Sequence, residues 1–288
     1  MAFTVNTNLM AQQAYLNLNK TSADMASSMA KLSSGLRINN ASDDAAGLSI
    51  SQGLTSQVDG SQIASRNAQD GINVIQTADG ALGEVHSILQ RMRDLAVQAG
   101  NDSNNVQSRA AITQEATSLA QEVQRIGAST NFNGINLLDG SAGTAGNMSF
   151  QVGAGSTVND KVTVDFNPAN LASINTALAG LTGAAGTSTD GFKDSASATS
   201  TIATLDNQIQ AVSTARAGLG ASVNRLTHAM NIANTTAQNL SAANSHITDT
   251  DMASEMVNYT KDSILSQAGT AMLAQANQSG QGILKLLG

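Results

Sequence analysis

The segment Ile202–Ile247 reads IATLDNQIQAVSTARAGLGASVNRLTHAMNIANTTAQNLSAANSHI, and the spacing of its apolar residues decides the fold. Two rows of positions, offset by three residues, each repeat every seven residues along this segment. One row is Ile202, Ile209, Arg216, Val223, Met230, Ala237 and Asn244, and the other is Leu205, Val212, Leu219, Leu226, Ala233, Leu240 and Ile247. A heptad pattern sustained this far predicts a coiled-coil helix about 70 Å long. Polar residues at such positions, here Arg216 and Asn244, often fix the register of a coiled coil.

An earlier segment carries the same pattern and predicts the partner helix. Its two rows are Ile75, Leu82, Leu89 and Ala96, and Ala78, Val85, Met92 and Ala99. Asp43 and Asp44 suit the positive end of a helix, so we expect it to begin there. Gly100 and the polar residues after it predict its end. The predicted seam between the two long helices contains Ile75, Leu82, Val85, Leu89, Met92, Leu205, Ile209, Val212, Leu219, Val223 and Leu226.

Between the two long helices the pattern changes. Asn104 and Gln107 resemble a capping box, which predicts a shorter helix through Ile112 and Ile126. Apolar residues then alternate with polar ones around Phe150 and again around Val164, and this period of two predicts a β-hairpin. Residues 180–200 are mostly Gly, Ala, Ser and Thr, which favours a surface loop or a small appendage.

Both ends of the chain are amphipathic, and neither end can bury its apolar residues by itself. The hairpin turns the chain back, so the two ends should run antiparallel and pair. A two-helix layer still leaves apolar surface bare, and a bare surface of that size marks an association site. We therefore expect the ends to be poorly ordered in the monomer and to fold when copies stack. The predicted self-assembly residues are Leu9, Leu16, Met25, Leu32, Leu36, Met256, Ile264, Leu265, Met272, Leu273, Leu284 and Leu287.

The composition excludes several classes of function. Charged residues make up 12% of the chain and the net charge is −7, which disfavours nucleic acid or an anionic membrane as partner. The absence of cysteine excludes disulfides, zinc thiolates and cysteine nucleophiles. No apolar run is long enough to cross a membrane, and no cleavable secretory signal opens the chain. A secretion route that reads no such signal remains open.

The titratable residues show no catalytic or metal-binding pattern. His86, His228 and His246 have no partners at metal-ligand spacing. Asp249 and Asp251 lack the Gly and the closing Glu of a calcium loop, so a pair of acids in the first turn of a helix explains them better. We therefore predict no enzyme activity, no cofactor and no metal.

Four segments of the chain resemble bacterial flagellins. Residues 31–50, KLSSGLRINNASDDAAGLSI, and residues 6–8, NTN, are similar to the family's amino-terminal signature. Residues 245–255, SHITDTDMASE, and residues 266–278, SQAGTAMLAQANQ, are similar to its carboxy-terminal signature. The resemblance covers roughly residues 1–140 and 200–288.

This resemblance implies a mainly α fold: a long antiparallel coiled-coil hairpin with a small central β-hairpin, whose terminal helices pair on filament assembly. Residues 1–42 and 248–288 would form the terminal domain that lines the filament core. Residues 43–139 and 195–247 would form a helical rod domain, and residues 140–194 the β-hairpin with a short variable surface segment. That short middle implies a thin, smooth filament without large outer domains.

The resemblance also implies partners and a location. The chain would polymerise with copies of itself into an extracellular flagellum that gives swimming motility, after export by the flagellar type III system. Cap and junction proteins would be further partners. An export chaperone would hold the carboxy-terminal end, and its candidate contacts are Ile264, Leu265, Met272 and Leu273.

Residues 90–98, QRMRDLAVQ, resemble the surface that the innate immune receptor for flagellin engages. The matching residues are Gln90, Arg91, Leu95 and Glu115. In the alternative reading, Arg91 and Asp94 form an ordinary surface pair and Leu95 packs in a subunit contact. The two readings are compatible, because one helical face can serve both.

Three other classes of protein would be expected to differ from this sequence. A hook–filament junction protein shares the opening motif but would be expected to lack the ending LAQANQ at residues 273–278. An enzyme built on this frame would need an inserted catalytic domain, for which the middle of the chain is too short. A coiled-coil adhesin or receptor fragment would usually show a membrane anchor or a signal.

Overall fold

The structure is a computed structural model that describes residues 8–183 and 190–287, with side chains described as far as residue 278. The chain divides into two compact units: residues 1–57 with 238–288, and residues 58–237. Two long helices, α2 (Ala45–Ala99) and α5 (Ser195–Thr248), each contribute to both units. The domain boundaries that we predicted from the sequence differ from this division and stay a prediction.

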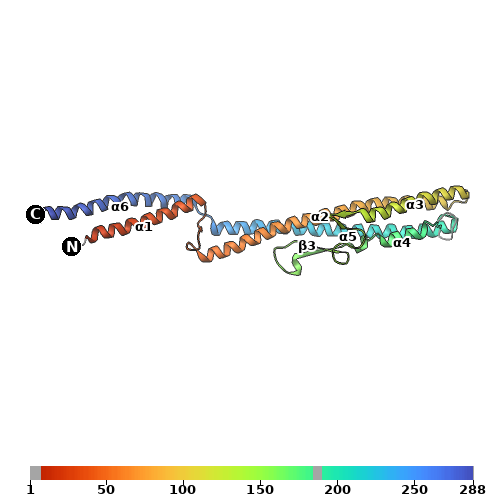
Figure 1. The fold of residues 1–288 in the computed structure, drawn as a ribbon, viewed down its shortest axis with the longest axis horizontal. Helices are drawn as coiled ribbons and strands as arrows, with labels where there is room; N and C mark the ends of the chain where they lie inside the picture. The colour runs from red at the N-terminus through yellow and green to blue at the C-terminus, as the bar shows by residue number, and fades with distance from the viewer. Residues whose placement is uncertain (1–7, 184–189, 288) are drawn as a thin grey trace. The chain divides into compact units, whose positions relative to one another are not determined.

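The unit of residues 58–237 is built on α2 and α5, which run antiparallel and side by side (Figure 1). Two ion pairs join them: Arg93 Nε lies 2.6 Å from Asp206 Oδ1, and Arg216 Nε lies 2.7 Å from Asp79 Oδ1. The hydrogen bond from Arg216, which occupies a predicted heptad position, raises the pKa of its guanidinium. A polar heptad residue thus pairs across the seam, as expected of a group that fixes register.

The two predicted rows on α2 are buried along their whole length, with exposed fractions of at most 1%. On α5 the two rows differ. Leu205, Val212, Leu219 and Leu226 are at most 2% exposed, whereas Ile209 and Val223 are half-buried at the edge of the core. The second row of α5 therefore faces the core, and the first row flanks it.

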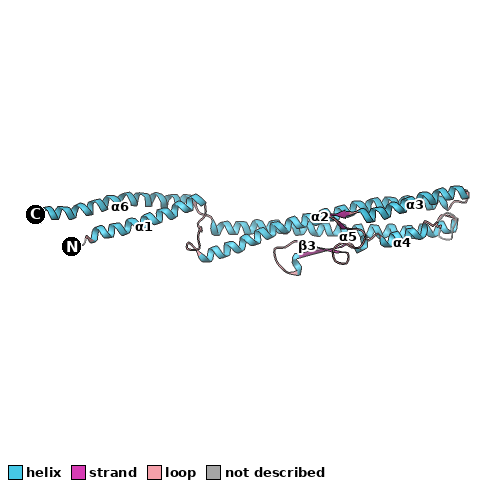
Figure 2. Cartoon of the chain, in the orientation of Figure 1, coloured by secondary structure: helices cyan, strands magenta, loops and turns pink. Residues whose placement is uncertain are grey.

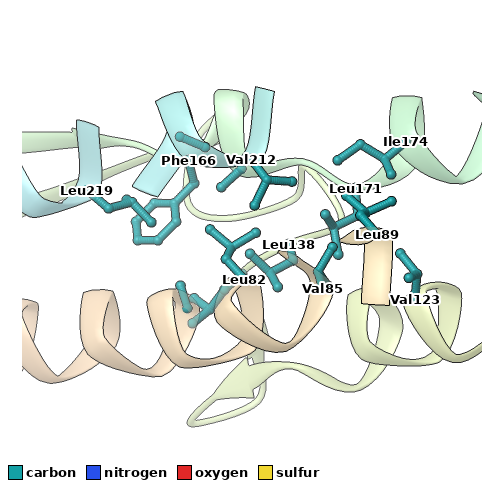
Figure 3. Close-up of a cluster of buried hydrophobic side chains, with 14 of the residues drawn as sticks. Leu82, Val85, Leu89, Val123, Leu138, Phe166, Leu171, Ile174, Val212 and Leu219 are labelled. Atoms are coloured by element: carbon teal, nitrogen blue, oxygen red, sulfur yellow. The ribbon is translucent and has the colours of Figure 1, made fainter. Parts of the chain in front are cut away.

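Two shorter helices extend this core, α3 (Val106–Ser129) and α4 (Ala172–Leu181). In Figure 3, Val123 of α3 and Leu171 and Ile174 from the α4 segment lie around Leu89 of α2. The predicted cap of α3 was wrong by one residue. Asn105 is the cap and accepts a hydrogen bond from the Ser108 amide at 2.8 Å.

The predicted β-hairpin is confirmed (Figure 2). Strands β3 (Asn147–Gln151) and β4 (Lys161–Asp165) pair antiparallel, and Phe150 lies opposite Val162. Gly71 of α2 allows close packing here, because an added Cβ would lie 3.0 Å from Leu226 and 3.1 Å from Phe150. A second, minimal pair is formed by β1 (Asn131–Phe132) and β2 (Ile135–Asn136). Short 3-10 turns lie at Val158–Asp160 and Asn167–Ala169.

The expectation that residues 180–200 form only a surface segment was wrong. Phe192 is fully buried in the core, and so is Ala198 at the start of α5. Asp190 is buried beside them and accepts a hydrogen bond from the Thr113 hydroxyl at 3.1 Å. This segment therefore closes the core next to α3. Residues 184–189 lie outside the described part of the chain.

The other unit pairs the two terminal helices, α1 (Leu9–Ser34) and α6 (Met252–Leu287), which run antiparallel side by side (Figure 1). Asn8 caps α1 and also donates a side-chain hydrogen bond to the Ala276 carbonyl oxygen at 2.9 Å. Asp251 caps α6 by accepting hydrogen bonds from the amides of Ala253 and Ser254. The predicted place of Asp251 at a helix start is thus confirmed, although it precedes the first turn. The prediction was wrong for Asp249, which lies before α6 and accepts hydrogen bonds from the Ser245 and Thr248 hydroxyls.

Candidate assembly surface

The seam between α1 and α6 has coiled-coil spacing but unusual chemistry. The residues that repeat at heptad spacing and are at least half-buried there are Ala11, Ala14, Leu18, Thr21, Met25, Ser28 and Leu32 on α1, and Glu255, Tyr259, Asp262, Ser266, Gly269, Leu273 and Ala276 on α6. Most of these side chains are small or polar, whereas a stable coiled coil places large apolar residues at such positions. The intrachain seam therefore contributes little burial of apolar surface.

Many of the other large apolar side chains of the same two helices are exposed outside this seam. On α1, Leu9 is 68% exposed and Leu16 is 56% exposed. On α6, Ile264 is 65%, Met272 61% and Leu265 47% exposed. The pair of terminal helices is thus more apolar on its outside than at its own contact. A surface of this kind marks an association site.

An open groove along the two helices joins this outer surface to the seam. It is lined by Ala14, Asn17, Leu18, Thr21, Leu265, Ala268, Gly269 and Met272. Gly269 brings the helices close together here, because an added Cβ would lie 3.3 Å from Leu18. Among its lining residues, Leu265 and Met272 are exposed, whereas Ala14, Leu18, Thr21 and Gly269 are half-buried.

The predicted self-assembly residues fall into three groups. Those exposed on the outer surface are Leu9, Leu16, Leu36, Met256, Ile264, Leu265 and Met272. Met25, Leu32 and Leu273 are half-buried in the seam, so they contact the other terminal helix of the same chain. Leu284 and Leu287 lie outside the residues whose side chains are described. Sequence reasoning missed Thr21, Ser28 and Ser266, because small polar residues give no apolar signal.

The predicted receptor surface on α2 and α3 is only partly exposed. Arg91 Nη2 lies 2.7 Å from Glu115 Oε1, and the two side chains are 55% and 45% exposed. Arg91 therefore pairs with Glu115 rather than with Asp94. Gln90 is exposed beside it, but Leu95 is only 2% exposed and packs inside its own chain. Leu95, which the resemblance places on the receptor surface, is therefore not accessible in this packing.

The described residues show no feature that suggests other chemistry. Among the side chains of residues 8–183 and 190–278, no cluster of three or more His, Asp or Glu is placed to hold a metal ion. Across the same ranges no helix is both long and apolar enough to span a membrane. The fold and this surface define a class of helical proteins whose two ends pair and leave an apolar outer surface for association.

Comparison with known proteins identifies the family within this class. The family described as the bacterial flagellin N-terminal helical region matches residues 5–143, and the bacterial flagellin C-terminal helical region matches residues 202–287. The flagellin of Halalkalibacterium halodurans is 46% identical over 98% of this chain and 99% of its own length. The flagellar filament 33 kDa core protein of Treponema phagedenis is 40% identical over the same shares of the two chains. The chain belongs to the bacterial flagellins, the structural subunits of flagellar filaments, and is a short form.

A solved structure described as a flagellar hook-associated protein from Vibrio parahaemolyticus has a similar fold. Its TM-score is 0.56, and the match covers 72% of this chain and 100% of that one. The sequence identity is only 16%, so this likeness shows the fold alone. The relatives that share 40–46% of their residues with this chain are flagellins and a filament core protein, which favours the filament subunit over the junction-protein alternative.

Proposed function

We propose that this chain self-polymerises through α1 and α6 into the flagellar filament, which turns to give swimming motility. The observation that carries the proposal is the distribution of side chains on the terminal helices: most of those in the seam are small or polar, and large apolar ones are exposed outside it. Burying one Leu, Ile or Met side chain stabilises a contact by about 1.5–3 kcal/mol. Neighbouring copies that cover Leu16, Ile264 and Met272 would thus supply what the intrachain seam lacks.

The exposed apolar surface of the terminal helices also suits the partners that an exported subunit would meet before it joins the filament. A chain whose ends gain stability only from neighbours can pass unfolded through the flagellar type III apparatus, and it needs protection before export. Ile264, Leu265 and Met272 are exposed on α6 and remain the candidate chaperone contacts, whereas Leu273 is half-buried against α1. Cap and junction proteins would be further partners at the ends of the extracellular filament.

Recognition by the innate immune receptor would use the polar part of the predicted surface. Gln90, Arg91 and Glu115 are exposed on α2 and α3, whereas Leu95 is buried. We expect Arg91→Ala to lower receptor activation by monomers at least about tenfold, because loss of an interface arginine often costs 2 kcal/mol or more. A reporter-cell assay measures this, with Arg125→Ala, an exposed arginine that pairs only within α3, as the control.

Electron microscopy of the purified chain tests the proposed polymerisation. At rising concentration the full chain should form thin, smooth filaments, because its middle is too short for large outer domains. A chain without residues 249–288 should stay soluble and monomeric, since it keeps the core of α2 to α5 but loses α6. Normal filaments from the shortened chain, or none from the full chain under any assembly condition, would contradict the proposal.

A further inference from the structure

The two linkers that join the terminal helices to α2 and α5 are bonded to each other. Leu36 and Asp249 face each other as an antiparallel bridge. The Arg37 amide donates to the Thr248 carbonyl oxygen at 2.6 Å, and the Thr250 amide donates to the Gly35 carbonyl oxygen at 3.0 Å. We refer to residues 35–37 and 247–250 as the clasp.

Side chains hold both halves of the clasp in place. Arg37 Nη2 donates to the Ile247 carbonyl oxygen at 2.7 Å, which satisfies a carbonyl at the end of α5. Gly35 ends α1 with a φ of +73°, a conformation that residues with a Cβ rarely adopt. The Asp43 carboxylate accepts hydrogen bonds from the amides of Asn40 and Asn39, and these bonds lower the pKa of Asp43. The first linker is therefore ordered rather than a loose tether.

The register of α1 against α6 agrees with the position of the clasp. Counting 28 residues back from Leu36 reaches Asn8, and counting the same number forward from Asp249 reaches Asn277. Asn8 in fact bonds to the carbonyl of Ala276, one residue away from that position. The register set at the clasp is thus kept to the far end of α1.

Where the seam is made of small side chains, it has little power to choose this register. Leu18 lies beside Gly269, which places Thr21 near Ser266, three residues further along α1 and three residues back along α6. A slip of one heptad would place Ser28 or Ala14 there instead, and because all four side chains are small, the slipped pair would meet no clash. Weakly patterned contacts of this kind are prone to slippage.

We propose that the clasp sets the register of α1 against α6, with Arg37 as a positioning residue. The register decides which large apolar side chains of the two helices stand next to each other on the outer surface. A slip of seven residues would shift Leu16 by about 10 Å relative to Leu265. The inference deepens the proposed function, because a fixed register gives every subunit the same assembly surface.

The absence of cysteine allows a direct test by disulfide trapping in the full-length chain under assembly conditions, where a cross-link within one chain is separated from one between chains by its size on a non-reducing gel. Three double variants share Ser266→Cys and carry Thr21→Cys, Ala14→Cys or Ser28→Cys as the second change. Only Cα atoms within about 7 Å can be bridged. We expect the Thr21 pair to cross-link at least about tenfold faster than the two slipped pairs. Adding Arg37→Ala, or Thr250→Pro to remove the amide donor, should bring the three rates within about threefold.

The controls separate positioning from a general loss of structure. Arg225→Ala removes the same charge from an exposed site on α5 and should keep the tenfold preference. Arg37→Lys keeps a cationic donor and should restore most of it. A preference that survives Arg37→Ala and Thr250→Pro, or no preference in the parent chain, would overturn the role of the clasp. Failure of the proposed function is seen separately, as a lack of filaments from the unmodified chain.

Discussion

Leu226→Asp is expected to lower the free energy of unfolding by about 3–5 kcal/mol, the cost of an uncompensated buried charge. Leu226 is fully buried on α5 and lies against Gly71 of α2. Burial takes an aspartate carboxylate at this position out of water, which is costly for a charged group. Urea denaturation followed by helical circular dichroism measures the loss.

The matched control for this variant is Ile232→Asp on the same helix. Ile232 is 66% exposed, so the same kind of change should alter stability by no more than about 0.5 kcal/mol. The pair of variants therefore tests whether the face of α5 that carries Leu226 lies in the core and the face that carries Ile232 lies outside it. Equal denaturation curves for Leu226→Asp and the parent would show that the register of the two long helices is wrong.

The second large effect is on assembly. The double variant Ile264→Asp with Leu265→Asp should abolish filament formation, because each contact that neighbouring copies make there would have to bury a carboxylate. Both side chains are exposed in the single chain, so the stability of the α2–α5 core should not change. Sedimentation and electron microscopy at concentrations where the parent polymerises measure the effect.

The control for assembly is Gln267→Asp with Thr270→Asp, which adds the same charge to polar, exposed positions of α6. It should form filaments with at most a modest rise in the concentration required. If both double variants fail equally, added charge alone is responsible. If both polymerise normally, the outer surface of α6 is not an assembly surface.

The long helices and the hairpin could be predicted because large apolar residues mark their buried positions. Leu82 and Leu89 on α2 and Leu219 and Leu226 on α5 repeat at heptad spacing and are all buried. Alternation around Phe150 revealed the hairpin in the same way. In these segments, hydrophobicity and burial coincide.

The terminal helices could not be predicted in the same detail, because hydrophobicity and intrachain burial separate there. Leu16 and Ile264 look like core residues and are exposed, while Ser28 looks like a surface residue and is buried. Phe192 was missed for a related reason, since the Gly, Ala, Ser and Thr around it indicate a loop. A pattern of apolar residues shows that burial is needed, but not whether the same chain supplies it.

Hydrogen exchange along α1 and α6, measured before and after polymerisation, tests most directly whether neighbouring copies complete these two helices. We predict that amides of residues 9–34 and 252–278 exchange rapidly in the dilute monomer and become protected in filaments of the parent. The Ile264→Asp and Leu265→Asp double variant should keep the rapid exchange at the same concentration. Full protection of both helices in the dilute monomer, unchanged on polymerisation, would contradict the account.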